Sequence, residues 1–255
     1  MATATTPLIS DAQKQQFIDE GYFVLERALS GEQLKLLQDT CQHFIDEMNA
    51  EMDRLGVTTL RGINHKNNRY FIPTFLSGSD RLGPVIFSET MAEINRATIG
   101  DESYLFLDQY VVKAPEKGLK FSWHQDSGYL GYEHRPYLTC WCALDDMNEE
   151  NGTIYVLPYS RAGTKDLIPH ETDSKINDKV GYFGDDPGIP VIVPAGSIAV
   201  FSSHLLHRSG FNTSQNFRRA WIAQYSAEPI HKKDSDEILY CAEPFLKDGK
   251  RVRTA

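Results

Sequence analysis

The chain has 255 residues, of which 41% are hydrophobic and 24% are charged, with a formal net charge of −9. This composition is typical of a globular protein with a full core, and it excludes an intrinsically disordered chain. The acidic balance argues against nucleic-acid binding, which normally requires a basic face. We expect no contact with a membrane interior, because no apolar run is long enough to cross a bilayer.

The cysteine pattern and the N-terminal segment bear on location. Cys41, Cys140, Cys142 and Cys241 have neither zinc-site spacing nor a CxxC motif. The first residues lack the charged and apolar regions of a secretory signal. We therefore expect a cytoplasmic protein in a reducing compartment.

The first hundred residues have a mainly helical pattern. A capped helix is expected from Ser10 to Gly21, followed by a short strand at 22–25. A second helix begins at Ser30, with apolar residues recurring every three or four positions as far as Met48. Residues 60–80 are irregular, and another helix is expected over about 84–98.

After Asp101 the pattern changes to short β-rich runs separated by turn signals. These runs cover 103–113, 121–126, 137–144, 152–157, 190–193, 197–202 and 218–226. Asn151-Gly152 predicts a hairpin with a type I′ turn. Residues 160–189 are polar and predict a long surface loop or lid. Helices followed by many short strands predict a mainly β, double-sheet fold with flanking helices.

The segment Trp123-His124-Gln125-Asp126 carries the first chemical signal. Alternate side chains of a strand share a face, so His124 and Asp126 are expected to point the same way. One imidazole and one carboxylate supply two of the three ligands in the facial set of two histidines and a carboxylate that suits non-haem Fe(II). The HxD pattern alone is weak, because it also occurs by chance.

The remaining groups come from later in the chain. His207, at the end of a predicted strand, can supply the third ligand, and His204 competes for that role. Arg218 opens another strand, where its guanidinium can bind a carboxylate through two parallel hydrogen bonds. An iron site beside such an arginine suits 2-oxoglutarate, which binds metal at one end and carries a carboxylate at the other. The order HxD…H…R is much more specific than any one of its parts.

Over about residues 10–228 the sequence resembles the phytanoyl-CoA dioxygenase family of Fe(II)- and 2-oxoglutarate-dependent oxygenases. The matching segments include the opening helix, glycine and strand, then Lys113-Ala114-Pro115, the HQD motif, Asn151-Gly152 with Leu157–Arg161, His207–Asn212 and Phe217-Arg218-Arg219. The resemblance implies a double-stranded β-helix, of the jelly-roll or cupin type. It predicts one domain over 1–255, with a helical flank to about 100, the jelly-roll core over 101–228 and a C-terminal extension over 229–255.

The resemblance also implies roles for particular residues. His124, Asp126 and His207 would hold Fe(II), Arg218 and Ser209 would bind the far carboxylate of 2-oxoglutarate, and Gln109 and Trp141 would line that co-substrate. Tyr159 and Arg161 depart from the glycine and histidine usual in the family, with no loss of a ligand. Asp126 stands where halogenating relatives have a small residue, so hydroxylation with O₂, releasing succinate and CO₂, is expected.

The substrate side is less defined. We expect the pocket mouth to come from residues 60–80, 127–136 and 160–189, with five candidate substrate contacts: Asn67, Arg69, Tyr70, Tyr129 and Tyr132. The acidic chain gives little support for a coenzyme A arm, which favours a small free metabolite as substrate. Two alternatives remain, a cupin-like metalloenzyme that does not use 2-oxoglutarate and a non-catalytic jelly-roll binding protein. The oligomeric state is not predicted by the sequence.

Overall fold

A computed structural model describes residues 7–75, 79–115, 120–173 and 178–253. The first two helices are α1 (Asp11–Glu20) and α2 (Gly31–Leu55). Each begins at a capping box, in which Ser10 pairs with Gln13 and Ser30 pairs with Gln33. The first helix ends at Gly21, whose φ of 82° lies in the left-handed region that favours glycine. Both helix starts are therefore confirmed.

The helix expected over 84–98 is two helices, α3 (Ser79–Ile86) and α4 (Glu89–Thr98). The division falls at Ser88, whose backbone is extended and whose hydroxyl accepts a hydrogen bond from the Met91 amide at 3.3 Å. An extended N-cap residue starts a new helix, which explains why one continuous helix is not formed.

Ten strands form the major sheet, in the order β1-β12-β7-β14-β5-β4-β3-β2, with β15 also paired to β5 and β16 to β15. All the pairings within it are antiparallel. The strands are β1 (Tyr22–Leu25), β2 (Thr59–Leu60), β3 (Asn64–His65), β4 (Arg69–Pro73), β5 (Ser103–Lys113), β7 (Leu138–Ala143), β12 (Ile198–Ser202), β14 (Arg218–Ser226), β15 (Glu243–Lys247) and β16 (Lys250–Arg251).

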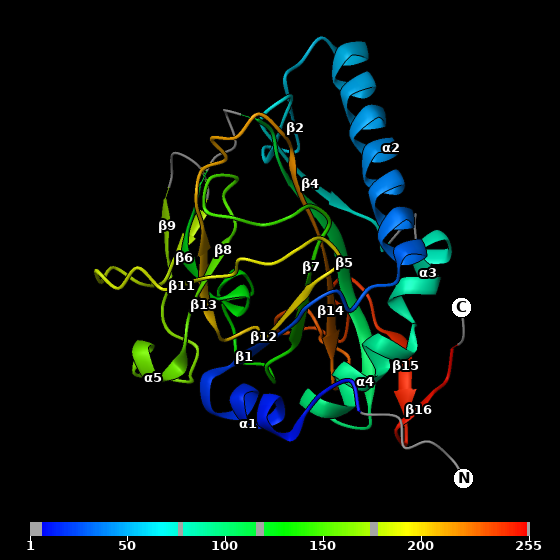
Figure 1. The fold of residues 1–255 in the computed structure, drawn as a ribbon, viewed down its shortest axis with the longest axis vertical. Coiled ribbons are helices and arrows are strands. Elements are labelled where there is room, and N and C mark those ends of the chain that lie inside the picture. The colour runs from blue at the N-terminus through cyan, green and yellow to red at the C-terminus, as the bar shows by residue number, and fades with distance from the viewer. Residues whose placement is uncertain (1–6, 76–78, 116–119, 174–177, 254–255) are drawn as a thin grey trace.

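A minor sheet of four strands has the order β11-β8-β13-β6. Its strands are β6 (Phe121–His124), β8 (Ile154–Leu157), β11 (Ile189–Pro190) and β13 (Leu206–Ser209). A two-stranded ribbon, β9 (Glu171–Asp173) and β10 (Asp178–Val180), and a short helix, α5 (Tyr159–Ala162), lie within the predicted 160–189 loop. Figure 1 shows α2, α3 and α4 beside the major sheet, on the side away from the minor sheet. This is the predicted double-sheet β fold with flanking helices.

The major sheet extends beyond the expected 101–228 core at both ends. Strands β2, β3 and β4 come from the segment predicted to be irregular, and β15 comes from the predicted C-terminal extension. Strands β2 and β3 are too short to show a strand period, because they have only two residues each, whereas β4 and β15 have five residues each. Residues 76–78 and 174–177 of the predicted pocket segments lie outside the described residues.

Asn151-Gly152 forms a turn that carries the chain from β7 of the major sheet to β8 of the minor sheet. These two strands do not pair with each other, so the predicted hairpin is wrong. Only Gly152 has a positive φ, of 75°, whereas a type I′ turn requires two such residues. A Cβ at Gly152 would lie 2.7 Å from the carbonyl oxygens of Gly210 and Phe211. The glycine therefore permits the close approach of the β13–β14 connection.

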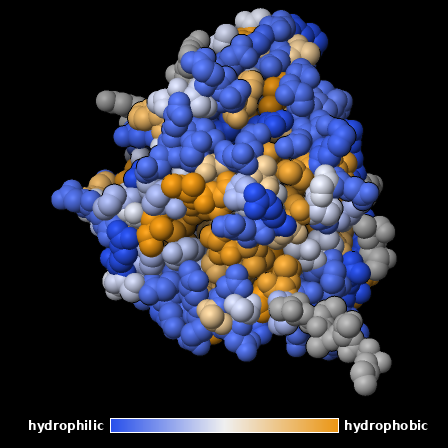
Figure 2. Space-filling model, in the orientation of Figure 1, coloured by the Kyte–Doolittle hydropathy of each residue, from blue (hydrophilic) through white to orange (hydrophobic). Residues whose placement is uncertain are grey.

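Two apolar clusters lie on opposite faces of the major sheet. The outer cluster joins α2, α3 and α4 to residues such as Tyr110 and Trp221, while the inner one contains Trp141, Ile222 and Phe201. Figure 2 shows apolar side chains gathered in the middle of one face, with polar side chains around them. Among the described residues, no helix is long and apolar enough to cross a membrane.

Candidate metal centre and co-substrate pocket

His124, Asp126 and His207 form a group whose ligand atoms all lie within 4.8 Å of one another. Asp126 Oδ1 lies 3.8 Å from Nε2 of His124 and 3.5 Å from Nε2 of His207. The two histidines are direct partners in the β6–β13 pairing, and their ring centroids are 4.2 Å apart. The sheet register thus brings together two ligands that are 83 positions apart in the sequence (207 − 124).

Asp126 lies just past the end of the strand that carries His124. Strand β6 ends at His124, and Asp126 begins a short 3₁₀ turn, Asp126–Tyr129. Gln125, between the two, is still extended, with a φ of −105° and a ψ of 139°. His124 and Asp126 therefore point the same way, as strand alternation predicted.

Backbone contacts set the tautomer of both histidines. Nδ1 of His124 lies 2.8 Å from the Ser122 carbonyl oxygen, and Nδ1 of His207 lies 3.0 Å from that of Leu205. A carbonyl oxygen only accepts hydrogen bonds, so each Nδ1 carries the proton and each Nε2 presents its lone pair to the centre. Burial, together with neighbouring His207, lowers the pKa of His124 well below its usual value, which keeps it neutral.

The second oxygen of Asp126 is held away from the histidines. Oδ2 accepts a hydrogen bond of 2.7 Å from Thr139 Oγ1 and one of 2.9 Å from Gln224 Nε2. Only Oδ1 is left facing the two imidazoles. Two imidazole nitrogens and one oriented carboxylate oxygen are the donor set that suits Fe(II) and leaves coordination positions open.

His204 does not belong to this group. Its Nδ1 lies 3.2 Å from the Lys165 carbonyl oxygen, and its ring is edge-on to His134. Among the described residues, His207 rather than His204 completes the cluster of possible metal ligands. This agrees with the sequence-based preference for His207.

The group opens into a cavity of about 500 Å³ between the two sheets. At one end of this cavity the strand register places three buried basic side chains side by side. We call these three residues, Arg69, Lys113 and Arg218, the cation row. Lys113 of β5 is the direct partner of both Arg218 of β14 and Arg69 of β4. Directly paired residues of a sheet share a face, so the three side chains lie on the same side. Asp178 offsets part of this charge, with a carboxylate oxygen 3.6 Å from Arg69.

Arg218 is the cation best suited to bind an added anion. It is 1% exposed, and its Nε has no hydrogen-bond partner among the described residues. Burial lowers its pKa to about 10, which still leaves the guanidinium charged at neutral pH. The neighbouring Arg219 points to the other face and forms a two-pronged pair with Asp145, at 2.6 Å and 3.1 Å. Arg218 therefore points toward the cavity and Arg219 away from it, as the alternation of neighbouring strand residues requires.

Ser209 and Lys113 stand beside Arg218 at this end. Nζ of Lys113 donates to Ser209 Oγ at 2.8 Å and also bonds the Gly210 carbonyl oxygen. Burial and the charge of Arg218 lower the pKa of Lys113 well below its usual value. The sequence analysis names Lys113 only as part of a matching segment and predicts no function for it. Its complete burial beside Arg69 and Arg218 indicates that it belongs to the anion-binding end of the site.

Gln109 and Trp141 lie between the cation row and Asp126. Ile222 of β14 is the direct partner of both Gln109 and Trp141. Two residues further along β14, Gln224 is the partner of Thr139, and both bond Asp126. The alternation of β14 from Arg218 to Gln224 therefore spans the whole site. Gln224 is not among the site residues predicted from the sequence, although it lies on the same face of β14 as Arg218.

The structure separates the five candidate substrate contacts. Arg69 and Tyr129 line the cavity, whereas Asn67, Tyr70 and Tyr132 do not. The prediction that Tyr70 contacts the substrate is corrected, because Tyr70 faces α2 and its hydroxyl donates to Asn49 at 2.8 Å. Asn67 is also corrected: it is a turn residue with a φ of 53°, and its backbone amide donates to the Tyr70 hydroxyl. Tyr132 is corrected as well, because its hydroxyl donates to the His231 carbonyl oxygen.

Several known proteins are similar to this chain in sequence or fold. A family model described as phytanoyl-CoA dioxygenase matches residues 17–220. The human peroxisomal phytanoyl-CoA dioxygenase is 20% identical over 87% of this chain and 70% of its own length. A 2-aminoethylphosphonate dioxygenase from an uncultured bacterium is 26% identical over 60% of this chain and 57% of its own length.

Two solved structures share the fold. EctD from S. alaskensis, with 2-oxoglutarate and 5-hydroxyectoine, is 18% identical with a TM-score of 0.71 over 100% of this chain and 90% of its own. EvdO2 from Micromonospora carbonacea var. aurantiaca, with 2-oxoglutarate, is 19% identical with a TM-score of 0.62 over 92% and 97%. The family match covers most of the chain and includes every member of the proposed metal site. The chain therefore belongs to the phytanoyl-CoA dioxygenase family and is an Fe(II)- and 2-oxoglutarate-dependent oxygenase.

Proposed function

We propose that this protein hydroxylates a small organic molecule at an unactivated C–H bond, while 2-oxoglutarate is converted to succinate and CO₂. The observation that carries the proposal is the position of Arg218. A buried guanidinium, whose Nε has no hydrogen-bond partner among the described residues, shares one cavity with two histidines and an oriented carboxylate. A cupin-like metalloenzyme that does not use 2-oxoglutarate would have no need of this arginine, and a metal-free binding protein would need none of the four residues.

Each part of the site has a task in this proposal. His124, Asp126 and His207 would hold Fe(II), while Thr139 and Gln224 fix the carboxylate so that one oxygen faces the metal. Arg218, Lys113 and Ser209 would bind the far carboxylate of 2-oxoglutarate, and Gln109 and Trp141 would flank the co-substrate. When bound, iron with 2-oxoglutarate and O₂ supplies the oxidising power that no side chain has.

Asp126 supports hydroxylation over halogenation, because it occupies the position that a halide would need. The expected compartment is cytoplasmic and reducing, which is supported by four free cysteines, three of them buried. A small-molecule substrate is supported by the size of the cavity, about 500 Å³, which must also hold 2-oxoglutarate.

Isotope labelling tests this proposal. The protein is supplied with Fe(II), 2-oxoglutarate, ¹⁸O₂ and chloride, and a panel of small metabolites is screened for succinate release. We expect one ¹⁸O atom in succinate and an ¹⁸O-labelled hydroxylated product, with His124→Ala as the inactive control. A chlorinated product, or substrate oxidation without succinate, would contradict the proposal.

A further inference from the structure

The cavity changes character beyond Asp126, at the end opposite the cation row. The lining there is apolar or aromatic and comprises Phe75, Phe106, Leu107, Leu130, Tyr137 and Tyr240. None of these six side chains carries a charge at neutral pH. We call this part of the cavity the aromatic chamber. Because the cation row would receive the co-substrate, the aromatic chamber is a part of the cavity that is free to receive the substrate.

Four rings of the aromatic chamber contact one another at an angle. The centroid of Phe106 lies 4.9 Å from that of Tyr137 and 5.3 Å from that of Tyr240, and Tyr240 lies 5.9 Å from Phe75. The interplanar angles are 51°, 58° and 64°. Tilted rings present both faces and edges to the cavity, which favours another ring over a flexible chain.

The other charged lining residues lie outside the aromatic chamber, and Arg61 among them belongs to the turn between β2 and β3. Asp178 pairs with Arg69 in the cation row, and Lys179 follows it in the same strand. Arg208 stacks on Tyr155 of the minor sheet, 3.8 Å from the ring centroid. Asp126 is the only acidic side chain near the chamber among the described lining residues, and Thr139 and Gln224 already bond it. A charged substrate group placed there would lose its water without gaining an opposite charge.

The aromatic chamber contains one well-buried hydroxyl group. Tyr137 lines the cavity, is 3% exposed, and carries a hydroxyl that can donate a hydrogen bond. A ligand that fills the cavity removes this hydroxyl from water, which is unfavourable unless the ligand supplies a hydrogen-bond partner. A carbonyl or hydroxyl oxygen on the substrate would accept its hydrogen bond.

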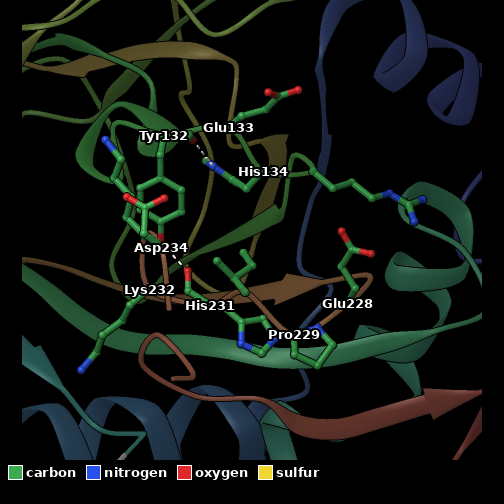
Figure 3. Close-up of a pocket in the computed structure, with 11 residues that line it drawn as sticks. Tyr132, Glu133, His134, Glu228, Pro229, His231, Lys232 and Asp234 are labelled. Carbon is green, nitrogen blue, oxygen red and sulfur yellow. Dashed lines mark hydrogen bonds between the residues drawn. The ribbon is translucent and has the colours of Figure 1, made fainter. Parts of the chain in front are cut away.

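Tyr240 comes from the segment 227–242, which connects β14 to β15. Figure 3 shows how this segment is tied down, with the Tyr132 hydroxyl bonded to the carbonyl oxygen of His231 at 2.7 Å. Leu239 also donates to the Ile230 carbonyl oxygen at 2.8 Å. The segment is therefore held in place, and it presents a half-exposed ring at the edge of the aromatic chamber.

We propose that the substrate is an uncharged, ring-containing compound with a carbonyl or hydroxyl oxygen, bound with its ring against Phe106 and Tyr240 and its oxygen at Tyr137. This inference rests on the proposed function, because it takes the cation row as the 2-oxoglutarate site. It disfavours amino acids, phosphonates and coenzyme A thioesters, whose charges the aromatic chamber does not match.

Calorimetry on the protein loaded with Fe(II) and 2-oxoglutarate, without oxygen, tests the inference. The probes are α-tetralone, its acyclic counterpart 2-decanone, the oxygen-free ring tetralin and the anion tetralin-1-carboxylate. We expect α-tetralone to bind more tightly than 2-decanone and the anion to show no saturable binding. Equal or tighter binding of the anion or of 2-decanone, or no binding of α-tetralone, would overturn the inference.

Variants locate the site. Tyr240→Ala is expected to weaken the binding of α-tetralone about three- to tenfold. Phe211→Ala is the matched control, because Phe211 is 51% exposed, against 50% for Tyr240, and lies outside the cavity. It is expected to have no effect. Tyr137→Phe is expected to weaken the binding of α-tetralone about three- to tenfold and to leave the affinity for tetralin unchanged. Unchanged α-tetralone affinity in both cavity variants would overturn the inference.

Parallel titration with 2-oxoglutarate separates this inference from the proposed function. A protein that binds 2-oxoglutarate but shows no preference for the neutral ring overturns the substrate class alone. A protein that fails to bind 2-oxoglutarate overturns the proposed function and the inference with it.

Discussion

Gln224 donates a hydrogen bond of 2.9 Å to Asp126 Oδ2, the oxygen that does not face the histidines. The same amide nitrogen lies 3.0 Å from Thr139 Oγ1, which also donates to Oδ2. The carboxylate of Asp126 is therefore oriented by two side chains from neighbouring strands of the opposite sheet. Orientation of this kind fixes a ligand before the metal binds, and its loss is measurable as metal affinity.

Gln224→Leu is expected to weaken Fe(II) binding by roughly 10- to 100-fold, because Asp126 can then rotate away from the histidines. The measurement is a metal titration under nitrogen, with circular dichroism to verify the fold. Gln38→Leu serves as a control, since that glutamine bonds the Leu144 carbonyl oxygen away from the cavity. Unchanged metal affinity in Gln224→Leu would show that Asp126 needs no such support.

The two histidines at 204 and 207 are expected to differ sharply in their effect on metal binding. His207→Ala removes a ligand from the only possible metal group found among the described residues, so we expect loss of most Fe(II) binding. His204→Ala removes a ring that contacts Lys165 and His134 instead, and it is expected to retain its metal. Metal content after dialysis against Fe(II) checks this, and the reverse result would exchange the two assignments.

Arg218 and Arg219 offer a test of the co-substrate site with adjacent residues of one strand. Removing a charged partner from a buried carboxylate costs roughly 2–5 kcal/mol. Arg218→Ala should therefore raise the Kd for 2-oxoglutarate by about 30-fold or more. Arg219→Ala breaks only the partly buried pair with Asp145 on the other face, so we expect little change. Calorimetry compares the two variants, and equal losses would contradict the assignment.

Most of the site was predictable because it depends on local pattern and strand alternation. The order His124, Asp126, His207 and Arg218 predicted the metal ligands and the cation, and the fold brings all four to one cavity. Alternation also placed Arg218 inward and Arg219 outward, as the buried cation and the Asp145 pair confirm. Alternation also predicted that His124 and Asp126 point the same way, and the extended Gln125 between them keeps it so, although a 3₁₀ turn begins at Asp126.

The rest of the site depends on pairings between distant segments, which a local pattern does not reveal. Lys113 is buried because β4 and β14 bring Arg69 and Arg218 to either side of it. Tyr70 was misplaced because a strand assignment for β4 is needed to decide which face it occupies. Tyr240 reaches the cavity from a segment with no regular strand or helix pattern, so nothing in its neighbourhood singled it out.

Asp108 provides a pH-dependent test of the fold itself. This carboxyl group is completely buried, accepts hydrogen bonds from Thr74 and from Trp221 Nε1, and has Oδ1 without a partner among the described residues. Burial raises its pKa to about 6, although these hydrogen bonds act in the opposite direction. In the unfolded chain the pKa returns to its usual value near 3.8. The folded state therefore binds the extra proton between these two values.

A raised pKa in the folded state means that the contribution of Asp108 to stability falls as the pH rises from about 4 to 6. The full difference corresponds to roughly 3 kcal/mol. Asp108→Asn keeps an acceptor for Thr74 and removes the titration. We expect its stability relative to the unsubstituted protein to increase by up to this amount between pH 4 and pH 7, measured by urea unfolding. Comparing the two proteins at each pH cancels every other titrating group. A stability difference that stays constant over this range would show that Asp108 is ionised in the fold throughout.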